Sequence, residues 1–237
     1  TLAEAIGAAI GEEALDQGVG VVLGPGCNIK RNPLCGRNFE YYSEDPYLSG
    51  KMAAGFIRGT EAQGVGTSLK HFAANSQETN RFASDSIMDE RTLREIYLTG
   101  FEIAVKEGKP ATVMCAYPKL NGIHCSDHKE LLTGILREEW SFDGMVISDG
   151  MDGYFSVDVS PADYEVIDCE GSYVSAGFVD IHQHGGGGSD YMEKEVLQAV
   201  EAGFLPEDEV DDSVRRILKL VQRAAENQKR EHACDYD

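Results

Sequence analysis

The sequence predicts an α/β protein, a partial or rebuilt (β/α) barrel of the TIM type with parallel strands. Short apolar runs alternate with amphipathic segments of helical length, which is the pattern of βαβ units. In addition, the polar residues of successive predicted strands come last in each strand, where α/β barrels build their active sites. About six strands are expected, and the edge strands of an open barrel favour either closure or a homo-oligomer.

The first predicted pair of elements is a helix followed by a strand. Thr1 and Glu4 have the T-x-x-E spacing of a capping box, and Gly18 supplies the stop at the other end. The apolar positions at helical spacing, expected to face the core, are Ile6, Ile10 and Leu15. Residues 19–23 form an unbroken apolar run and are predicted to be a buried strand.

The second pair begins at Ser43 and Pro46, because proline is favoured at the first positions of a helix. The side chains expected to face the core from this helix are Leu48, Met52 and Phe56. Residues 66–72 follow as the next strand, and the polar residues Lys70 and His71 come near its end.

The remaining elements repeat the alternation. Asp89 is expected to start a helix that closes at Gly108, with an apolar face made of Leu93, Ile96, Phe101 and Val105. A strand, a helix with Ser126 as its N-cap, and a further strand are then predicted over residues 111–117, 126–138 and 145–149.

Composition restricts the class of partner. The 237 residues include 41 Asp+Glu against 21 Lys+Arg, a net charge of −20, which argues against nucleic-acid and anionic-membrane partners. No apolar run reaches the roughly 18 residues of a transmembrane helix, and the first residues do not resemble a secretory signal. Six dispersed cysteines without a CxxC pair indicate reduced thiols and predict a cytoplasmic protein.

One carboxylate and several cations occupy the predicted strand ends and the first long loop. Asp149 ends its strand, Lys70 and His71 end an earlier one, and Arg37 precedes them. A carboxylate among cations keeps a low pKa and stays ionised, which suits a nucleophile or a stabiliser of an oxocarbenium ion. The alternative is that the cations bind sugar hydroxyls through charge-assisted hydrogen bonds.

Ordered motifs run through the same region. They are Gly36-Arg37-Asn38-Phe39-Glu40, Ser43-Glu44-Asp45-Pro46, Lys70-His71-Phe72 with Asn75, Gln77-Glu78 and Arg81, Asp89-Glu90-Arg91-Thr92-Leu93-Arg94-Glu95, Met114-Cys115-Ala116-Tyr117, Asn121-Gly122 and Val146-Ile147-Ser148-Asp149. Together they resemble glycoside hydrolase family 3, in its β-glucosidase branch. The resemblance extends from residue 1 to about residue 149 and resumes over residues 195–224.

The resemblance implies a retaining mechanism on β-D-glycosides, with a small saccharide or glycoside as substrate and no cofactor. Asp149 matches the nucleophile. The positions that match residues holding or lining the sugar pocket are Arg37, Lys70, His71, Met114 and Tyr117. Glu78 and Arg81 match residues that brace the site, and the alternative is a plain ion pair between them.

Three departures from the family pattern predict impaired activity. The first barrel strand, with an Asp that grips the sugar, and the second domain, which supplies the acid/base Glu, are not seen in this sequence. Gly150 follows Asp149 where many relatives carry Trp. Retention needs two carboxyl groups about 5–5.5 Å apart, and the available stand-ins for the acid are Glu78, Asp85 and Asp152. Only substrates with very good leaving groups are then expected to react.

A second motif, His182-Gln183-His184 followed by four glycines, lies in residues 166–188. This segment is similar to the opening of amidohydrolases, N-acetylglucosamine-6-phosphate deacetylase above all. Alternate strand residues point the same way, so His182 and His184 can share one Zn²⁺ or other divalent metal. A catalytic zinc site needs about three protein ligands, so a packed or solvated histidine pair is the alternative.

The two resemblances divide the chain into four parts. They are a family 3-like barrel portion over residues 1–153, an amidohydrolase-like insert over 154–192, barrel helices over 193–226 and a polar tail over 227–237. This division predicts a chimera. Three functions stay open: an impaired β-glucosidase, a metal-dependent deacetylase, and an inactive chimeric or truncated barrel.

Overall fold

The computed structural model describes residues 1–148, 215, 216 and 219. Its main feature is a four-stranded sheet in which every pair is parallel, with the order β1-β2-β4-β7. The strands are β1 (Val21–Val22), β2 (Gly66–Phe72), β4 (Thr112–Cys115) and β7 (Met145–Ile147). This arrangement confirms the predicted α/β class with parallel strands.

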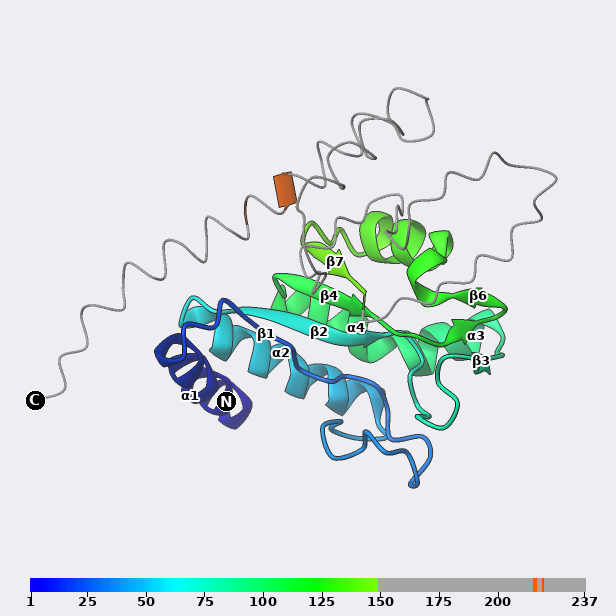
Figure 1. The fold of residues 1–237 in the computed structure, drawn as a ribbon, viewed down its shortest axis with the longest axis horizontal. Coiled ribbons are helices and arrows are strands. Elements are labelled where there is room, and N and C mark those ends of the chain that lie inside the picture. Colours follow the sequence, from blue (N-terminus) through cyan, green and yellow to red (C-terminus); the bar gives the residue numbers. More distant parts are fainter. Residues whose placement is uncertain (149–214, 217–218, 220–237) are drawn as a thin grey trace, which may run out of the picture. The chain divides into compact units, whose positions relative to one another are not determined.

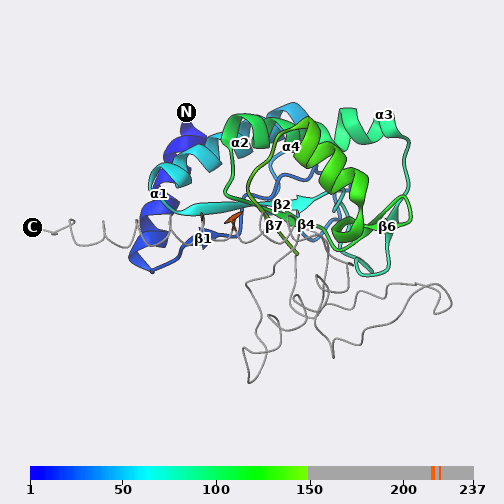
Figure 2. The ribbon, with the colours of Figure 1, turned by 90° about the horizontal axis from the view of Figure 1, so that it is seen from above.

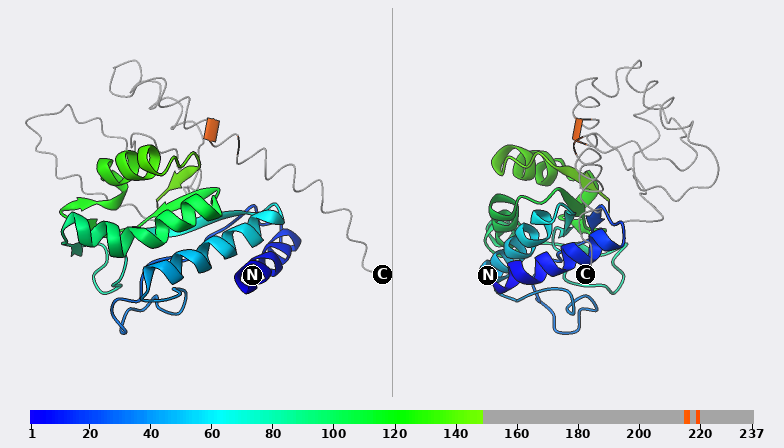
Figure 3. Two further views of the ribbon diagram at one scale, coloured as in Figure 1. Left: turned by 180° about the vertical axis from the view of Figure 1, so that it is seen from behind. Right: turned by 90° about the vertical axis from the view of Figure 1, so that its left-hand side faces the viewer.

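Helices cover one face of this sheet (Figures 1 and 2). They are α1 (Leu2–Asp16), α2 (Pro46–Ala62) and a long helical segment made of α3 (Glu90–Thr92), η1 (Leu93–Leu98), α4 (Thr99–Ile103) and η2 (Ala104–Gly108), in which η1 and η2 have π geometry. From behind, α2 and this long segment lie side by side on the sheet (Figure 3). In the described residues, β1, β2 and β4 are each followed by helical structure that returns to the start of the next strand of this sheet.

The predicted helix starts are confirmed by their caps. The Thr1 hydroxyl accepts from the Glu4 amide while the Glu4 carboxylate bonds back to Thr1, which completes the capping box. Asp45 caps α2, which has Pro46 at its first position, and Asp89 caps α3. Gly18 follows α1 with φ +67°, a conformation that glycine adopts without strain.

The predicted core faces of α1 and α2 are correct only in part, because Ile10, Leu15, Met52 and Phe56 are half-buried. Ile6 is 46% exposed and Leu48 is 49% exposed, whereas small residues of both helices are buried at their mutual contact. A Cβ added to Gly59 would overlap the Glu4 carbonyl oxygen, and one added to Gly7 would overlap that of Phe56. The two helices approach too closely for large side chains at their contact. A stripe of Gly and Ala residues therefore lies there, and Ile6 and Leu48 do not.

Two other boundaries also differ from the prediction. β1 has two half-buried residues, Val21 and Val22, instead of a five-residue buried run, and in the described part of the sheet it pairs with β2 alone. The predicted helix over residues 126–138 splits into a short turn, η3 (Cys125–Asp127), and η4 (Glu130–Glu139). Ser126 does not cap η4. Instead, His128 Nδ1 accepts the Leu131 amide at 3.3 Å.

A small second sheet, absent from the sequence prediction, lies beyond the carboxyl ends of the main strands (Figure 1). It contains β3 (Asp85–Ser86), β5 (Lys119–Leu120) and β6 (Ile123–His124), in the order β3-β5-β6. β5 and β6 form a hairpin whose turn contains Gly122 at φ +89°. The hairpin and β3 hold together the segments that follow β2 and β4, which is where the predicted site residues lie.

The core between the main sheet and its helices is aromatic. The Phe72 ring meets the rings of Phe101 and Trp140 edge-on, with centroids 5.3 and 5.7 Å apart. Leu93, Phe101 and Val105 are buried as predicted, whereas Ile96 of the same helical face is 39% exposed. Phe72 directly follows His71 in β2, so the core that fixes this strand also fixes the predicted site residues.

Several predictions concern residues that lie outside the described part of the chain. Asp149, the second residue after β7 in the sequence, is one of them, and His182 and His184 are others. Residues 215, 216 and 219 are helical, within the predicted 193–226 segment. In the described residues, Cys27, Cys35, Cys115 and Cys125 are free thiols, as predicted, and no described helix is long and apolar enough to cross a membrane.

Candidate active site

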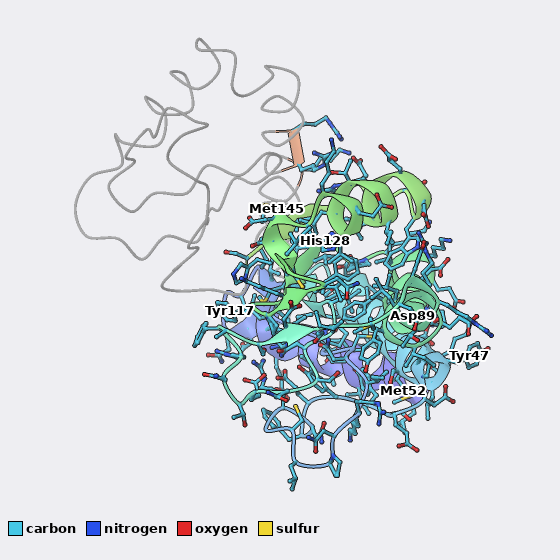
Figure 4. All side chains as sticks on the ribbon, turned by 90° about the vertical axis from the view of Figure 1, so that its right-hand side faces the viewer. Tyr47, Met52, Asp89, Tyr117, His128 and Met145 are labelled. Atoms are coloured by element: carbon cyan, nitrogen blue, oxygen red, sulfur yellow. The ribbon has the colours of Figure 1, made fainter. Side chains whose placement is uncertain are left out.

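The candidate site lies at the carboxyl ends of β2 and β4 and in the loops that follow β1 and β2. Both loops extend from the same end of the sheet (Figure 1), as parallel register requires. Figure 4 looks toward this end and shows Tyr117 on the side of the strands opposite Tyr47 and Asp89, where helices start. The residues of the candidate site come from three separate stretches of sequence. These are the loop after β1, the end of β2 with the loop that follows it, and the end of β4.

The backbone at the end of β2 is held by a buried amide. Asn28 donates from Nδ2 to the His71 carbonyl at 2.9 Å and accepts the His71 amide on Oδ1 at 2.7 Å. The Cys27 amide donates to the Lys70 carbonyl at 2.7 Å. These three bonds attach the loop after β1 to the end of β2, which fixes the directions in which Lys70 and His71 leave the strand.

Two cations share one carboxylate beside this strand end. Glu40 accepts from Arg37 Nε and, at 3.0 Å, from Lys70 Nζ, and all three side chains are mostly buried. Burial opposes ionisation of Glu40, but hydrogen bonds from Arg37 and Lys70 outweigh it and leave the pKa of Glu40 below its usual value. The cluster carries two positive charges and one negative charge, so it can attract a carboxylate or polarised hydroxyls.

His71 lies next to this cluster and is fully buried. Its Nε2 is 2.9 Å from Arg37 Nη2 and its Nδ1 is 3.2 Å from the Tyr41 hydroxyl. Burial first, and then the charges of Arg37, Lys70 and Arg81, lower the pKa of His71 to about 2. The imidazole is consequently neutral at physiological pH, so its contribution to the site is hydrogen bonding without charge.

A second cluster joins the loop after β2 to the end of β4. Glu78 accepts from Asn75 Nδ2 and from Arg81 Nη1, both at 3.0 Å, which confirms the expected ion pair. The Arg81 guanidinium lies over the Tyr117 ring, 4.8 Å from its centroid, and over the Phe82 ring at 5.2 Å. This stacking places an aromatic ring and a cation together, a combination that suits sugar faces and hydroxyls.

The structure thus brings together Arg37, Lys70 and His71 in one cluster, and Glu78, Arg81 and Tyr117 in another. Tyr41 and Asn75 connect the two by hydrogen bonds. Met114 is buried in β4 opposite Ile147 of β7, near the point where the chain approaches Asp149 in sequence. Asp85, one proposed stand-in acid, lies instead in β3, where it accepts the Gly122 amide at 3.1 Å.

Sequence reasoning gave no role to four residues of this site: Asn28, Glu40, Tyr41 and Asn75. Glu40 and Asn75 lie inside the quoted motifs, and the spacing of Arg37 and Glu40 is a signal for an ion pair that could have been used. Asn28 and Tyr41 gave no comparable signal, because their partners lie 43 and 30 residues away. In the described residues, no group of three or more His, Cys, Asp or Glu side chains could hold a metal ion.

The neutral state of His71 predicts an acid-dependent loss of stability. The unfolded chain protonates this residue near 6.5, whereas the folded chain does so only near 2. Between these values the unfolded state binds more protons, so stability falls as the pH falls, by at most about 1.4 kcal/mol per pH unit. Chemical denaturation between about pH 7 and pH 5 should therefore show a smaller loss in His71→Gln than in the wild type. Parallel losses in both proteins would contradict a buried, neutral His71.

A parallel α/β sheet that gathers cations, acids and an aromatic ring at its carboxyl edge is the arrangement found in α/β barrels, whose active sites lie at that edge. The chain itself belongs to glycoside hydrolase family 3, because the profile described as "Glycosyl hydrolase family 3 N terminal domain" matches residues 1–220. This finding confirms the resemblance drawn from the motifs, together with the predicted TIM-like barrel fold.

Known relatives support this membership over most of the chain. Thermostable beta-glucosidase B of Acetivibrio thermocellus is 48% identical over 236 residues, which is all of this chain and 29% of the relative. Exo-alpha-(1->6)-L-arabinopyranosidase of Bifidobacterium longum is 42% identical over 92% of this chain and 26% of its own length. The structure of beta-glucosidase 3B from Thermotoga neapolitana in complex with glucose has a TM-score of 0.78 and 47% identity, over 96% of this chain and 30% of that one. The chain spans about a third or less of these relatives.

Proposed function

We propose that this chain is the sugar-binding barrel portion of a retaining glycosidase that acts on β-D-glucosides. The observation that carries this proposal is the convergence of Arg37, Lys70, Arg81 and Tyr117 at the ends of two adjacent parallel strands in a family 3 chain. Cationic and aromatic groups held in place by Glu40 and Glu78 suit the recognition of a polar sugar ring.

In this proposal Asp149 is the nucleophile. Its carboxylate attacks C1 of the glycoside, a carboxylate–C1 bond forms, and the C1–O bond breaks as the aglycone leaves with the bonding electrons. Asp149 follows β7, which lies beside β4, and the cations at the neighbouring strand ends favour an ionised carboxylate. The residues proposed to contact or line the glycone are Arg37, Lys70, Met114 and Tyr117. The buried His71, also a predicted glycone residue, is proposed to act there through Arg37, to which its Nε2 is bonded. Arg81 and Glu78 are proposed to brace the site.

We propose that the leaving group of the glycoside determines whether the 237-residue chain reacts with it. Retention uses a second carboxyl group as acid and base, and Glu40 and Glu78 are already engaged with Arg37, Lys70 and Arg81. We therefore expect reaction with glycosides whose aglycone leaves as a stable anion, and little reaction with alkyl glucosides. The chain is similar both to beta-glucosidases and to an arabinopyranosidase, so α-L-arabinopyranosides are the second sugar to compare.

The test is intact-mass spectrometry after incubation with 2,4-dinitrophenyl 2-deoxy-2-fluoro-β-D-glucoside. The fluorine slows hydrolysis of the glycosyl ester, and dinitrophenolate leaves without an acid. We expect one fluoroglucosyl adduct on the wild type, none on Asp149→Ala, and an unchanged adduct on the control Asp127→Ala, in which an exposed carboxylate is removed.

Peptide mapping of the adduct should locate it on Asp149. The absence of an adduct on folded wild-type protein would overturn the proposed activity and leave the chain as a folded but inactive barrel. An adduct that persists in Asp149→Ala would keep the glycosidase activity but assign the nucleophile to another carboxylate.

The amidohydrolase-like segment, the chimera and the metal pair His182 and His184 stay predictions, as do a cytoplasmic location and a homo-oligomer. Two histidines supply fewer ligands than a catalytic zinc site uses, and we favour the glycosidase for that reason. Metal analysis of dialysed protein is the direct check, because a bound divalent metal would favour the deacetylase instead.

A further inference from the structure

The hydroxyl of Tyr41 is buried between the two clusters of the candidate site. It lies 3.2 Å from His71 Nδ1, 3.1 Å from Asn75 Nδ2 and 3.2 Å from the Asn75 carbonyl oxygen. Tyr41 itself is only 3% exposed. Burial raises the pKa of its phenol above the usual value, so the hydroxyl keeps its proton.

The directions of these bonds follow from the chemistry of the groups. An amide NH₂ can only donate and a carbonyl oxygen can only accept. The Tyr41 hydroxyl therefore accepts from Asn75 Nδ2 and donates its single proton to the Asn75 carbonyl oxygen. With that proton used, the hydroxyl can meet His71 Nδ1 only as an acceptor, which requires a proton on Nδ1.

The opposite side of the imidazole leads to the same conclusion. Arg37 is always protonated and offers only donors, so Nε2 must accept from Arg37 Nη2 at 2.9 Å. A neutral histidine has one protonated nitrogen and one acceptor nitrogen, and these two neighbours fix which is which. Arg37 and Tyr41 thus require the same tautomer of His71, with the proton on Nδ1.

We propose that Tyr41 is a positioning residue, which acts by holding His71 as the Nδ1-protonated tautomer so that its Nε2 orients the guanidinium of Arg37 for the sugar. The part that concerns the sugar rests on the proposed function. In the other tautomer, an Nε2–H would point at the N–H groups of Arg37, which would lose an acceptor in a buried place. Arg37 would then be oriented by Glu40 alone.

Tyr41 also connects the two clusters. The same Asn75 Nδ2 that donates to Tyr41 donates to Glu78 Oε1, and Glu78 binds Arg81. One unbroken chain of hydrogen bonds therefore runs from Arg37 through His71, Tyr41, Asn75 and Glu78 to Arg81. Removal of the Tyr41 hydroxyl interrupts this chain at its midpoint without removing any charge.

The first measurement is the tautomer itself. In the 237-residue chain labelled with ¹⁵N-histidine, long-range proton–nitrogen correlation separates protonated from unprotonated ring nitrogens, and His71→Gln identifies the signals of His71. We expect a protonated Nδ1 and an unprotonated Nε2 in the wild type at neutral pH. Tyr41→Phe should give a mixture or the opposite tautomer. This measurement does not depend on any activity.

The second measurement is the rate of adduct formation with the fluoroglucoside described above. Tyr41→Phe should slow it about 10- to 100-fold, because small misplacements of a binding group cost rates of this size. Tyr42→Phe is the matched control, since the neighbouring Tyr42 is also largely buried but its hydroxyl makes no hydrogen bond in the described part of the chain. It should keep both the wild-type tautomer and the wild-type rate.

Three results would overturn the proposal. They are an Nε2-protonated His71 in the wild type, an unchanged tautomer in folded Tyr41→Phe, and a wild-type adduct rate in a Tyr41→Phe protein whose tautomer has changed. If Tyr41→Phe does not fold, an Nε2-protonated His71 in the wild type would still overturn the proposal. A wild type that shows the expected tautomer but forms no adduct would refute the glycosidase activity and the sugar part of the proposal, while the hydrogen-bond assignment would stand.

Discussion

Replacement of Glu40 by glutamine is expected to reduce the rate of fluoroglucosyl adduct formation by about 100-fold. Glu40 is the only carboxylate in the described residues that contacts both Arg37 and Lys70. A neutral amide would leave two mostly buried cations without their counter-ion, and they would repel each other out of position. The side-chain volume is unchanged, so the effect reports charge and direction, not packing.

The same change should lower the free energy of unfolding by about 1–3 kcal/mol, less than for a fully buried pair, because the three side chains keep some contact with water. Glu44→Gln is the matched control, since Glu44 lies four residues further along the chain and is exposed. It should change neither quantity measurably. A Glu40→Gln protein that labels as fast as the wild type would show that Arg37 and Lys70 are not placed by this carboxylate.

The sequence predicted those elements whose signals are local. The caps at Thr1 and Asp89 and the proline at the start of α2 depend on residues within three positions, and β2 is bounded as expected. The predicted strand-end residues Lys70 and His71 do lie at the carboxyl end of β2. Such features need no knowledge of tertiary contacts, because the hydrogen bonds that define them are made within one turn or one strand.

The errors arose where a distant partner decides the outcome. Periodicity favoured Ile6 and Leu48 as core residues, but the close approach of α1 and α2 buries Gly7 and Gly59 instead. Hydrophobic patterns record which side chains are apolar, whereas the distance between two helix axes depends on both helices together. For the same reason no local pattern indicated that Tyr41 would contact His71 and Asn75.

Replacement of Glu61 by alanine is expected to cost about 2–4 kcal/mol of stability, although the residue belongs to none of the candidate site motifs. Its Oε1 accepts the Thr67 amide at 3.0 Å, the Thr67 hydroxyl at 2.7 Å and the Ala111 amide at 2.7 Å. Thr67 is the second residue of β2, and Ala111 is the residue just before β4. One carboxylate at the end of α2 therefore joins the starts of two neighbouring strands.

The cost follows from the donors that would lose their acceptor, since each poorly solvated N–H without a partner costs about 1–3 kcal/mol. Urea unfolding gives the measurement, and Lys51→Ala is the control on the same helix. Lys51 pairs with Glu107 at 2.5 Å, but both side chains are well exposed, so its loss should cost less than about 1 kcal/mol. Equal costs for the two variants would show that Glu61 acts only as a surface charge.

The rate of adduct formation by Glu61→Ala distinguishes the role of the strand starts from the role of the strand ends. Glu61 acts where β2 and β4 begin, whereas Glu40 acts where β2 ends. In α/β barrels the amino-terminal ends of the strands serve stability and the carboxyl-terminal ends serve the reaction. Folded Glu61→Ala should therefore label at close to the wild-type rate while unfolding more easily, the reverse of the pattern expected for Glu40→Gln. A labelling defect as large as that of Glu40→Gln would mean that the strand starts also set the geometry of the site.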